Sequence, residues 1–153
     1  MIGLVLFLAN ARERMKDEKE IRALISAHFE PMCWDAENEP DWQSFREDFH
    51  TGALLCGAAR PAQLRTLDGF IERMEAVARK SLQIFEEHTK GMKILRFGNV
   101  AVVLAMSEML ENGTDVNYDI SGYLLVKSDG RWSIAAHAWD QAEDENSVPG
   151  DLR

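Results

Sequence analysis

The 153-residue sequence has few of the residues that mark specialised protein classes. Its two cysteines, Cys33 and Cys56, are too few for a disulfide framework and fit no metal knuckle, so we expect reduced thiols, with one disulfide or a reactive thiol as alternatives. Basic residues number 17 against 26 acidic ones, a net charge of −9. This balance disfavours nucleic acid and anionic membrane surfaces as partners. The rest is ordinary globular composition, 46% hydrophobic and 28% charged, for one domain.

Residues 1–16 are expected to form an extension ahead of the domain. The apolar run that ends at Ala11 resembles the back half of a secretory signal, but it lacks a basic start and is shorter than the ~15 residues such a signal needs. It is also shorter than the ~20 residues that cross a bilayer. Met15, just before the first amphipathic helix, is an alternative start. We therefore expect a cytoplasmic protein, with export as the alternative.

Helical segments are predicted in the first half of the chain. Apolar residues between 21 and 32 recur at the spacing of one helical face, and Pro31 should end or kink that helix. Asp41 and Thr66 have side chains typical of N-caps and predict a second and a third helix. Between these two helices, residues 53–56 predict a short buried strand, followed by a loop.

An antiparallel meander is predicted in the second half. Its expected strands are 82–97, 100–111, 116–127 and 132–141. Asn112-Gly113 and Asp129-Gly130 are typical two-residue turns, and Gly91 is expected to form a bulge or a bend in the first of these strands. Helices followed by a meander imply an α+β fold with three N-terminal helices packed on a strongly curved antiparallel sheet. Such a sheet leaves a hollow in which a small ligand would bind.

Four short segments follow one another in a recognisable order. They are Phe29-x-x-Met32-Cys33-Trp34, Asp41-Trp42-Gln43-Ser44-Phe45, residues 97–103, and Asp129-Gly130-Arg131-Trp132-Ser133-Ile134. In order and spacing they resemble the nuclear transport factor 2-like superfamily, and within it the SnoaL-like proteins. The resemblance covers residues 17–141, and residues 142–153 are expected to form an acidic mobile tail.

The resemblance implies a cone-shaped, cystatin-like α+β domain with a pocket between sheet and helices, and a homodimer formed through the sheet. The superfamily includes isomerases, dehydratases, polyketide cyclases, an epoxide hydrolase and non-enzymatic binders, so the fold alone does not select a function. We expect a small-molecule-binding domain of unknown specific function that needs no cofactor. The alternative is a cofactor-free acid–base enzyme of lyase, isomerase or polyketide-cyclase type, acting on a small apolar substrate.

The last two predicted strands carry the first candidate site residues. Alternation places one set of side chains on a common face, which the resemblance implies is the concave one: Ser133, Ala135, His137 and Trp139. There His137 would act as base or proton donor beside the Trp139 ring; the alternative is a hydrogen-bonded core histidine. Tyr118 is expected to face inward and donate to a ligand oxygen, with strand-edge packing as the alternative. Asp119 and Tyr123 would then face outward, unless a bulge reverses the alternation.

The first meander strand carries Glu86 and His88, two residues apart and so on one face. Leu82, His88 and Gly91 are similar in spacing to the strand that bears one catalytic histidine in scytalone dehydratase. The second histidine of that enzyme should fall near Leu104, so the pair is incomplete here. We therefore keep His88 as a candidate catalytic residue and Glu86 as a candidate ligand contact, with a solvated sheet edge as the alternative.

Two further ligand contacts are expected at Glu108 and Trp34. Glu108 would have a raised pKa if it faced the hollow, and would be an ordinary surface charge if it faced outward. Trp34 would line the pocket mouth or belong to the core. The four histidines lie on four separate elements without paired spacing, so we expect no metal site.

Overall fold

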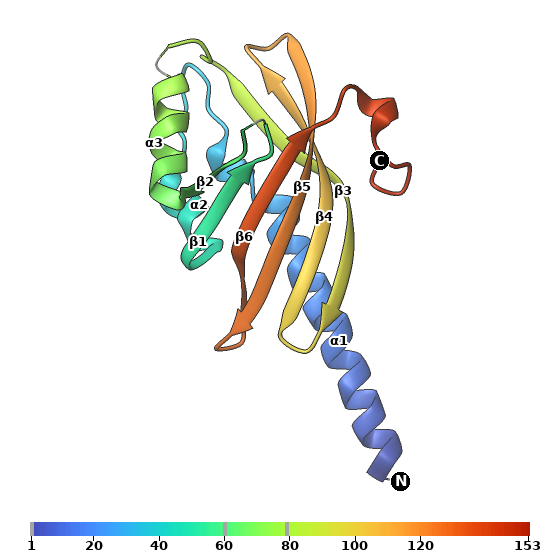
Figure 1. Cartoon of the computed structure of the whole chain (residues 1–153). Coiled ribbons are helices and arrows are strands. Elements are labelled where there is room, and N and C mark those ends of the chain that lie inside the picture. Colours follow the sequence, from blue (N-terminus) through green and yellow to red (C-terminus); the bar gives the residue numbers. More distant parts are fainter. Residues whose placement is uncertain (1, 60, 79) are drawn as a thin grey trace.

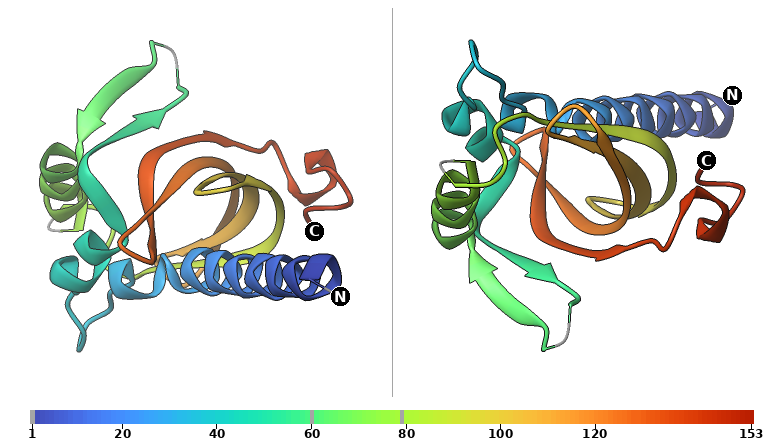
Figure 2. Two further views of the ribbon diagram at one scale, coloured as in Figure 1. Left: turned by 90° about the horizontal axis from the view of Figure 1, so that it is seen from below. Right: turned by 90° about the horizontal axis from the view of Figure 1, so that it is seen from above.

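One strongly curved sheet forms a trough, and helical segments lie along its open side and at one end (Figures 1 and 2). The computed structural model describes residues 2–59, 61–78 and 80–153, and side chains from residue 11 onward within them. The strands are β1 (Phe49–Gly57), β2 (Gln63–Thr66), β3 (Phe85–Phe97), β4 (Val100–Glu111), β5 (Asp115–Ser128) and β6 (Arg131–Gln141). Their order across the sheet is β2-β1-β6-β5-β4-β3. The predicted α+β class and the strong curvature are confirmed.

The helical segments that precede β3 lie against the concave side of the sheet and at one end of it, and a short one that follows β6 belongs to the segment on the outer face. They are α1 (Ile2–Ala27), η1 (Glu30–Met32), α2 (Trp42–Glu47), α3 (Leu67–Ala78) and η2 (Glu145–Ser147). α1 runs along the open side of the curved sheet, and α3 lies beside β1 and β2 (Figure 2). Both predicted N-caps are confirmed, because Asp41 accepts a hydrogen bond from the Ser44 amide and Thr66 accepts one from the Gly69 amide.

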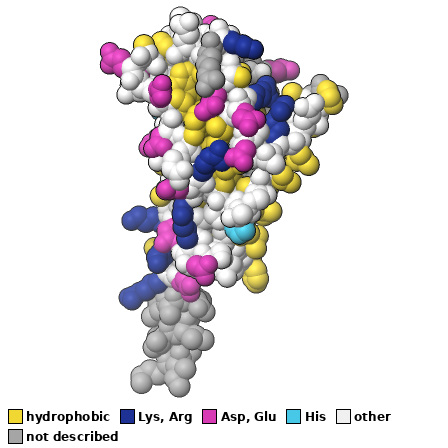
Figure 3. Space-filling model, turned by 90° about the vertical axis from the view of Figure 1, so that its left-hand side faces the viewer, with side chains coloured by type: hydrophobic (Ala, Val, Ile, Leu, Met, Phe, Trp, Pro, Cys, Tyr) yellow, Lys and Arg dark blue, Asp and Glu magenta, His cyan; other side chains and the backbone are white. Residues whose placement is uncertain are grey.

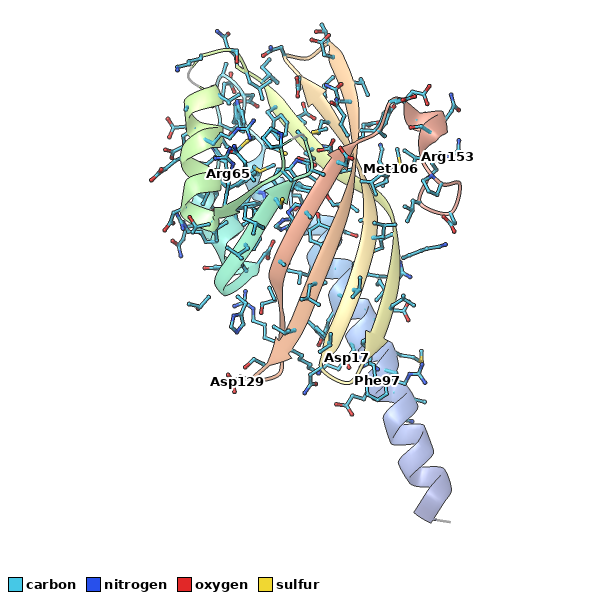
Figure 4. All side chains as sticks on the ribbon, in the orientation of Figure 1. Asp17, Arg65, Phe97, Met106, Asp129 and Arg153 are labelled. Carbon is cyan, nitrogen blue, oxygen red and sulfur yellow. The ribbon has the colours of Figure 1, made fainter. Side chains whose placement is uncertain are left out.

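α1 is continuous from Ile2 to Ala27, so the segment expected as an extension forms the first part of this helix. The side chains of residues 1–10 lie outside the described residues. Asp17 fixes the helix where it passes the β3–β4 turn (Figure 4): Arg96 lies 3.0 Å from its carboxylate and Lys127 lies 2.7 Å away. Although burial alone would raise the pKa of Asp17, hydrogen bonds from Lys127 and Trp132 hold it below its usual value.

The sheet differs from the predicted one at its β1 end. β1 begins at Phe49, earlier than the predicted strand, and β2 occupies part of the predicted loop. β1 lies parallel to β6, so one parallel pair interrupts an otherwise antiparallel sheet. A parallel pair needs a long crossover connection, which β2, α3 and the meander provide here.

A bulge in β6 decides which of its side chains face the interior. Leu125 pairs with Ile134 but Leu124 pairs with Ala136, so Ala135 is the extra residue. The predicted common face from Ser133 to His137 is therefore wrong, because the alternation reverses at Ala135. Because of the bulge, Ile134, which precedes it, and His137, which follows it, both face the interior.

The chain after β6 folds back on the outer face of the sheet, although we expected a mobile tail there. Val148 and Leu152 are buried in a small cluster with Met106 of β4 (Figure 4). The Leu152 carbonyl lies against Gly91, where an added Cβ would be 2.3 Å from its oxygen. The predicted bulge or bend at Gly91 is confirmed, since the β3–β4 register shifts there. We attribute the ordered position of this acidic segment to the burial of its two apolar side chains and to its close backbone contact with Gly91.

Candidate functional site

A cavity of about 230 Å³ lies between the concave face of the sheet, α3 and the segment around η1. Its apolar lining comes from α3, from the segment around η1 and from the sheet with the residues just before β3; the residues are Phe70, Met74 and Val77, then Phe29 and Met32, then Leu82, Phe85, Met109 and Trp139. Figure 3 views the molecule from the side of α3, where apolar side chains lie between acidic and basic ones. The volume is below the roughly 300–1,000 Å³ of pockets for drug-sized ligands, so the cavity suits a smaller molecule.

Polar side chains from adjacent strands form the floor of this cavity. Glu87 comes from β3, Asp119 and Ser121 from β5, and His137 from β6. Ser107 of β4 lies between the first two, because it pairs directly with Asp119 and donates a 2.6 Å hydrogen bond to Glu87 Oε1. Sheet pairing and strand alternation thus bring polar groups from four strands to one place.

The two floor carboxyls have shifted and separated pKa values. Burial raises the pKa of Glu87 to about 8, despite the hydrogen bond from Ser107, and the charge of Asp119 raises it further. Burial raises the pKa of Asp119 to about 6, with a further contribution from the charges of Asp140 and Glu111. At neutral pH Glu87 is therefore mainly protonated and Asp119 mainly ionised. One cavity thus holds a carboxylic acid and a carboxylate, as acid–base chemistry requires.

His137 lies on this floor as a neutral imidazole. Its ring is 5% exposed and stacks on Tyr123 with 4.3 Å between ring centroids. Burial lowers the pKa of His137 well below its usual value, and nearby His28 lowers it further. Its Nε2 atom lies 2.9 Å from Ser121 Oγ. Of the candidates from sequence, His137 and Trp139 are the two brought together at the cavity.

Tyr118 and Glu108 lie on the outer face of the sheet, away from the cavity. Tyr118 packs against the small apolar cluster that Met106 forms with Val148 and Leu152. Glu108 forms a 3.0 Å ion pair with Lys90. The predicted inward position of Tyr118 is wrong. β5 carries apolar side chains on both faces, so simple alternation does not distinguish the inner face from the outer one.

Glu86, His88 and Trp34 also lie outside the cavity. Glu86 and His88 share a face of β3, as their spacing predicted, but it is the exposed outer face, where they lie 3.6 Å apart. Trp34 is a core residue whose Nε1 donates to the Leu82 carbonyl and whose ring stacks on Phe85. All three line a second, more open hollow of about 420 Å³ beside the segment that follows η1, so their roles in ligand binding stay a prediction.

Sequence reasoning missed the floor carboxyls, Glu87 and Asp119. A signal for Glu87 was present, since it shares the buried face of β3 with Phe85. For Asp119 the signal would have been the burial of Tyr123, four residues later on the same face.

No group of three or more histidine, cysteine or acidic side chains in ranges 2–59, 61–78 and 80–153 is arranged to hold a metal ion. In the same ranges, no helix has both the length and the apolar character that a bilayer crossing needs.

No protein-family model matches the chain, and neither does any curated protein. Solved structures do match. A nuclear transport factor 2 (NTF2)-like protein with a cystatin-like fold from Novosphingobium aromaticivorans is 12% identical, with 95% of each chain covered and a TM-score of 0.70. A putative scytalone dehydratase from the same organism is 14% identical, with 93% of this chain and 89% of that chain covered and a TM-score of 0.55.

A third match is a ketosteroid isomerase-like protein from Erwinia carotovora atroseptica. It is 19% identical, with 82% of this chain and 96% of that chain covered, and has a TM-score of 0.59. At such identities the similarity concerns the backbone and not the site. The chain has the cystatin-like α+β fold of NTF2-like proteins.

Proposed function

We propose that this chain is a SnoaL-like small-molecule-binding domain that takes a small, neutral and largely apolar compound into the cavity. The observation that carries the proposal is the division of the cavity into a largely apolar lining, which comes from α3, the segment around η1 and part of the sheet, and a cluster of polar side chains on the sheet. Such a division buries the body of a ligand and orients its polar end. Acidic groups dominate the floor, so a neutral ligand is favoured over an anionic one.

The floor also restricts which hydrogen-bonding groups the ligand can carry at its polar end. Protonated Glu87 is a hydrogen-bond donor, whereas ionised Asp119 only accepts. A ligand that carries a carbonyl oxygen together with a hydroxyl or an acidic C–H would use both groups. One-ring ketones and enones combine these features with a size that the cavity accepts.

Acid–base catalysis without a cofactor is the second proposal. The observation that favours it is the presence, in one cavity, of two carboxyls whose pKa values are about 8 and about 6. Asp119 would accept a proton from carbon or oxygen, and Glu87 would donate one to a developing oxyanion. The reaction would be of lyase, isomerase or cyclase type, in keeping with the names of two matched structures, a putative scytalone dehydratase and a ketosteroid isomerase-like protein.

Binding is tested with 3-methylcyclohex-2-enone as a neutral one-ring probe, by calorimetric titration alongside a panel of similar ketones. Val77→Trp would fill the cavity from α3 and is expected to abolish binding. Ala76→Trp adds the same side chain at the exposed neighbouring position and should bind like wild type. No binding by any panel member, or equal binding by both variants, would contradict the binding proposal.

Catalysis is tested with the same enone in deuterium oxide, by following exchange of its acidic C–H protons by NMR. Asp119→Asn is expected to slow enzyme-dependent exchange by roughly 10²–10⁴-fold, the usual cost of losing a general base. Asp115→Asn, at the exposed start of the same strand, is the matched control. Exchange at the wild-type rate in Asp119→Asn would exclude Asp119 as the base.

A homodimer that forms through the outer face of the sheet, in a cytoplasmic protein, completes the proposal. The exposed apolar side chains on this face that support it are Leu95, Phe97, Val100, Val102, Leu104 and Leu124. An apolar surface of this kind on a sheet is typical of association between subunits. Two free cysteines accord with a reducing compartment.

A further inference from the structure

Beneath the cavity floor, three ring side chains from distant parts of the chain meet in the core. His28 follows α1, Tyr123 belongs to β5 and His137 to β6, and their exposed fractions are 0%, 1% and 5%. The centroid of the His28 ring is 5.8 Å from that of Tyr123 and 5.8 Å from that of His137. The three rings are therefore in contact with one another.

Each of these rings carries one buried polar atom that has no hydrogen-bond partner among the described residues. The atoms are His28 Nε2, Tyr123 Oη and His137 Nδ1. Buried polar groups are paired almost without exception in folded proteins, because an unpaired one loses its hydration without replacement. Three such atoms on three adjoining rings call for one shared partner.

The other nitrogen of each histidine is already bonded, and these bonds fix a direction. His28 Nδ1 lies 2.8 Å from Asp48 Oδ2, and a carboxylate oxygen only accepts, so the proton of this bond belongs to Nδ1. In the neutral ring, His28 Nε2 is then an acceptor. At the other end, His137 Nε2 lies 2.9 Å from Ser121 Oγ, which lines the cavity.

We propose that a single internal water molecule binds between His28 Nε2, Tyr123 Oη and His137 Nδ1 and completes a hydrogen-bonded relay from the cavity to Asp48. The water accepts from Tyr123 and from His137 Nδ1–H, and it donates to His28 Nε2. Three bonds are the usual number for a buried water. The side chain of Asp48 is 20% exposed, so the relay ends at solvent.

The relay can carry one proton outward with every bond balanced. Ser121 passes its hydroxyl proton to His137 Nε2, and His137 Nδ1 passes its own to the water. The water passes a proton to His28 Nε2, and His28 Nδ1 passes one to Asp48, which exchanges it with solvent. Ser121 regains its proton from the cavity. This use of the relay rests on the proposed proton-transfer function, whereas the water site itself does not.

The relay predicts the proton position on both buried rings. In the full chain labelled with ¹⁵N-histidine, long-range ¹H–¹⁵N spectra report the tautomer of all four histidines, and exposed His50 and His88 serve as internal references. We expect His28 and His137 both to carry their single proton on Nδ1. A proton on Nε2 of either ring would overturn the relay, because that atom must accept.

Variants test the connection itself. Asp48→Ala is expected to change the ring signals of both His28 and His137, and Glu47→Ala, which removes the neighbouring exposed charge, to change neither. Tyr123→Phe should likewise shift both rings, with Tyr118→Phe as the control. A response confined to His28 in Asp48→Ala would overturn the proposal.

A crystal structure of the wild-type chain gives the direct view, and it needs no variant to fold. We expect a water oxygen within about 3 Å of His28 Nε2 and of His137 Nδ1. A direct hydrogen bond between Tyr123 and His28 without water would overturn the proposal. These results are independent of enone binding, so failure of the proposed function and failure of the relay are distinguishable.

Discussion

The inner and outer faces of the same sheet put similar residues to different uses. Glu86 and Glu87 are neighbours on β3, yet Glu86 lies on the outer face, exposed and paired with His88. Glu87 faces the cavity, where burial raises its pKa to about 8. Residue type is identical, so the difference comes entirely from the direction of the side chain. In this sheet, the inner face therefore holds the acidic side chains with shifted pKa values. Paired substitutions on the two faces test this difference.

The largest expected effect is on the pH dependence of stability. The pKa of Glu87 is raised in the folded chain, so the native state binds this proton more tightly than the unfolded state does. The contribution of this proton to the free energy of unfolding is complete below pH 4.5. It is lost as the pH rises to about 8, and the loss amounts to up to roughly 5 kcal/mol. Glu87→Gln should remove this loss, as measured by urea unfolding at a series of pH values.

Glu86→Gln is the matched control for that series, and we expect it to keep the wild-type slope. His137 contributes in the opposite direction, since its lowered pKa makes the folded chain less stable as the pH falls. This contribution is the same in wild type, Glu87→Gln and Glu86→Gln. Parallel stability curves for wild type and Glu87→Gln between pH 5 and pH 8 would show that Glu87 has no raised pKa.

The second prediction compares two leucines that are adjacent on β5. Leu125 faces the core and is fully buried, whereas Leu124 faces outward and is 41% exposed. Leu125→Ala should lower the free energy of unfolding by roughly 2–5 kcal/mol, as cavity-forming core substitutions do. Leu124→Ala should cost less than about 1 kcal/mol. Chemical denaturation measures both, and equal losses would mean that the two faces are assigned wrongly.

The third prediction concerns the C-terminal segment on the outer face. An alanine Cβ at Gly91 would lie 2.3 Å from the Leu152 carbonyl oxygen, so Gly91→Ala should displace the segment at a cost of roughly 1–3 kcal/mol. Hydrogen exchange should then become faster at residues 148–152. Gly122→Ala, whose nearest contact is 3.8 Å, should leave exchange unchanged. Wild-type protection in Gly91→Ala would argue against the docked position.

The smallest effect is expected on association. Leu104→Asp places a charge in the exposed apolar surface of β4 and should weaken the proposed dimer about tenfold, about 1.4 kcal/mol, without unfolding the chain. Leu64→Asp, on β2 at the far edge of the sheet, should leave association unchanged. Sedimentation velocity distinguishes these results, and a monomeric wild type would exclude the homodimer.

Local signals in the sequence were enough to predict the tight turns and two of the helix starts. Asn112 and Asp129 adopt positive φ with the glycines that follow them, as two-residue turns demand, and these turns fix the ends of β4, β5 and β6. The Asp41 and Thr66 caps fixed helix starts for the same reason, because a cap needs only neighbouring backbone amides. Such features depend on residues a few positions apart.

Features that depend on residues far apart in the sequence were not predictable from local patterns. The inward position of Asp119 depends on packing against other strands, and β5 is apolar on both faces, so its own pattern does not set the direction. His137 was assigned to the right face although the Ala135 bulge broke the alternation behind it. The docking of Leu152 depends on a glycine 61 positions earlier, which no local pattern reveals.

The concave face of the sheet holds a carboxyl group, that of Glu87, in its acid form at neutral pH. The direct measurement is a titration of the Glu87 side-chain carboxyl by ¹³C NMR in glutamate-labelled protein, with the signal assigned by its loss in Glu87→Gln. A buried Glu87 in its acid form predicts a midpoint near pH 8. A midpoint near 4.5, the ordinary value for glutamate, would contradict it.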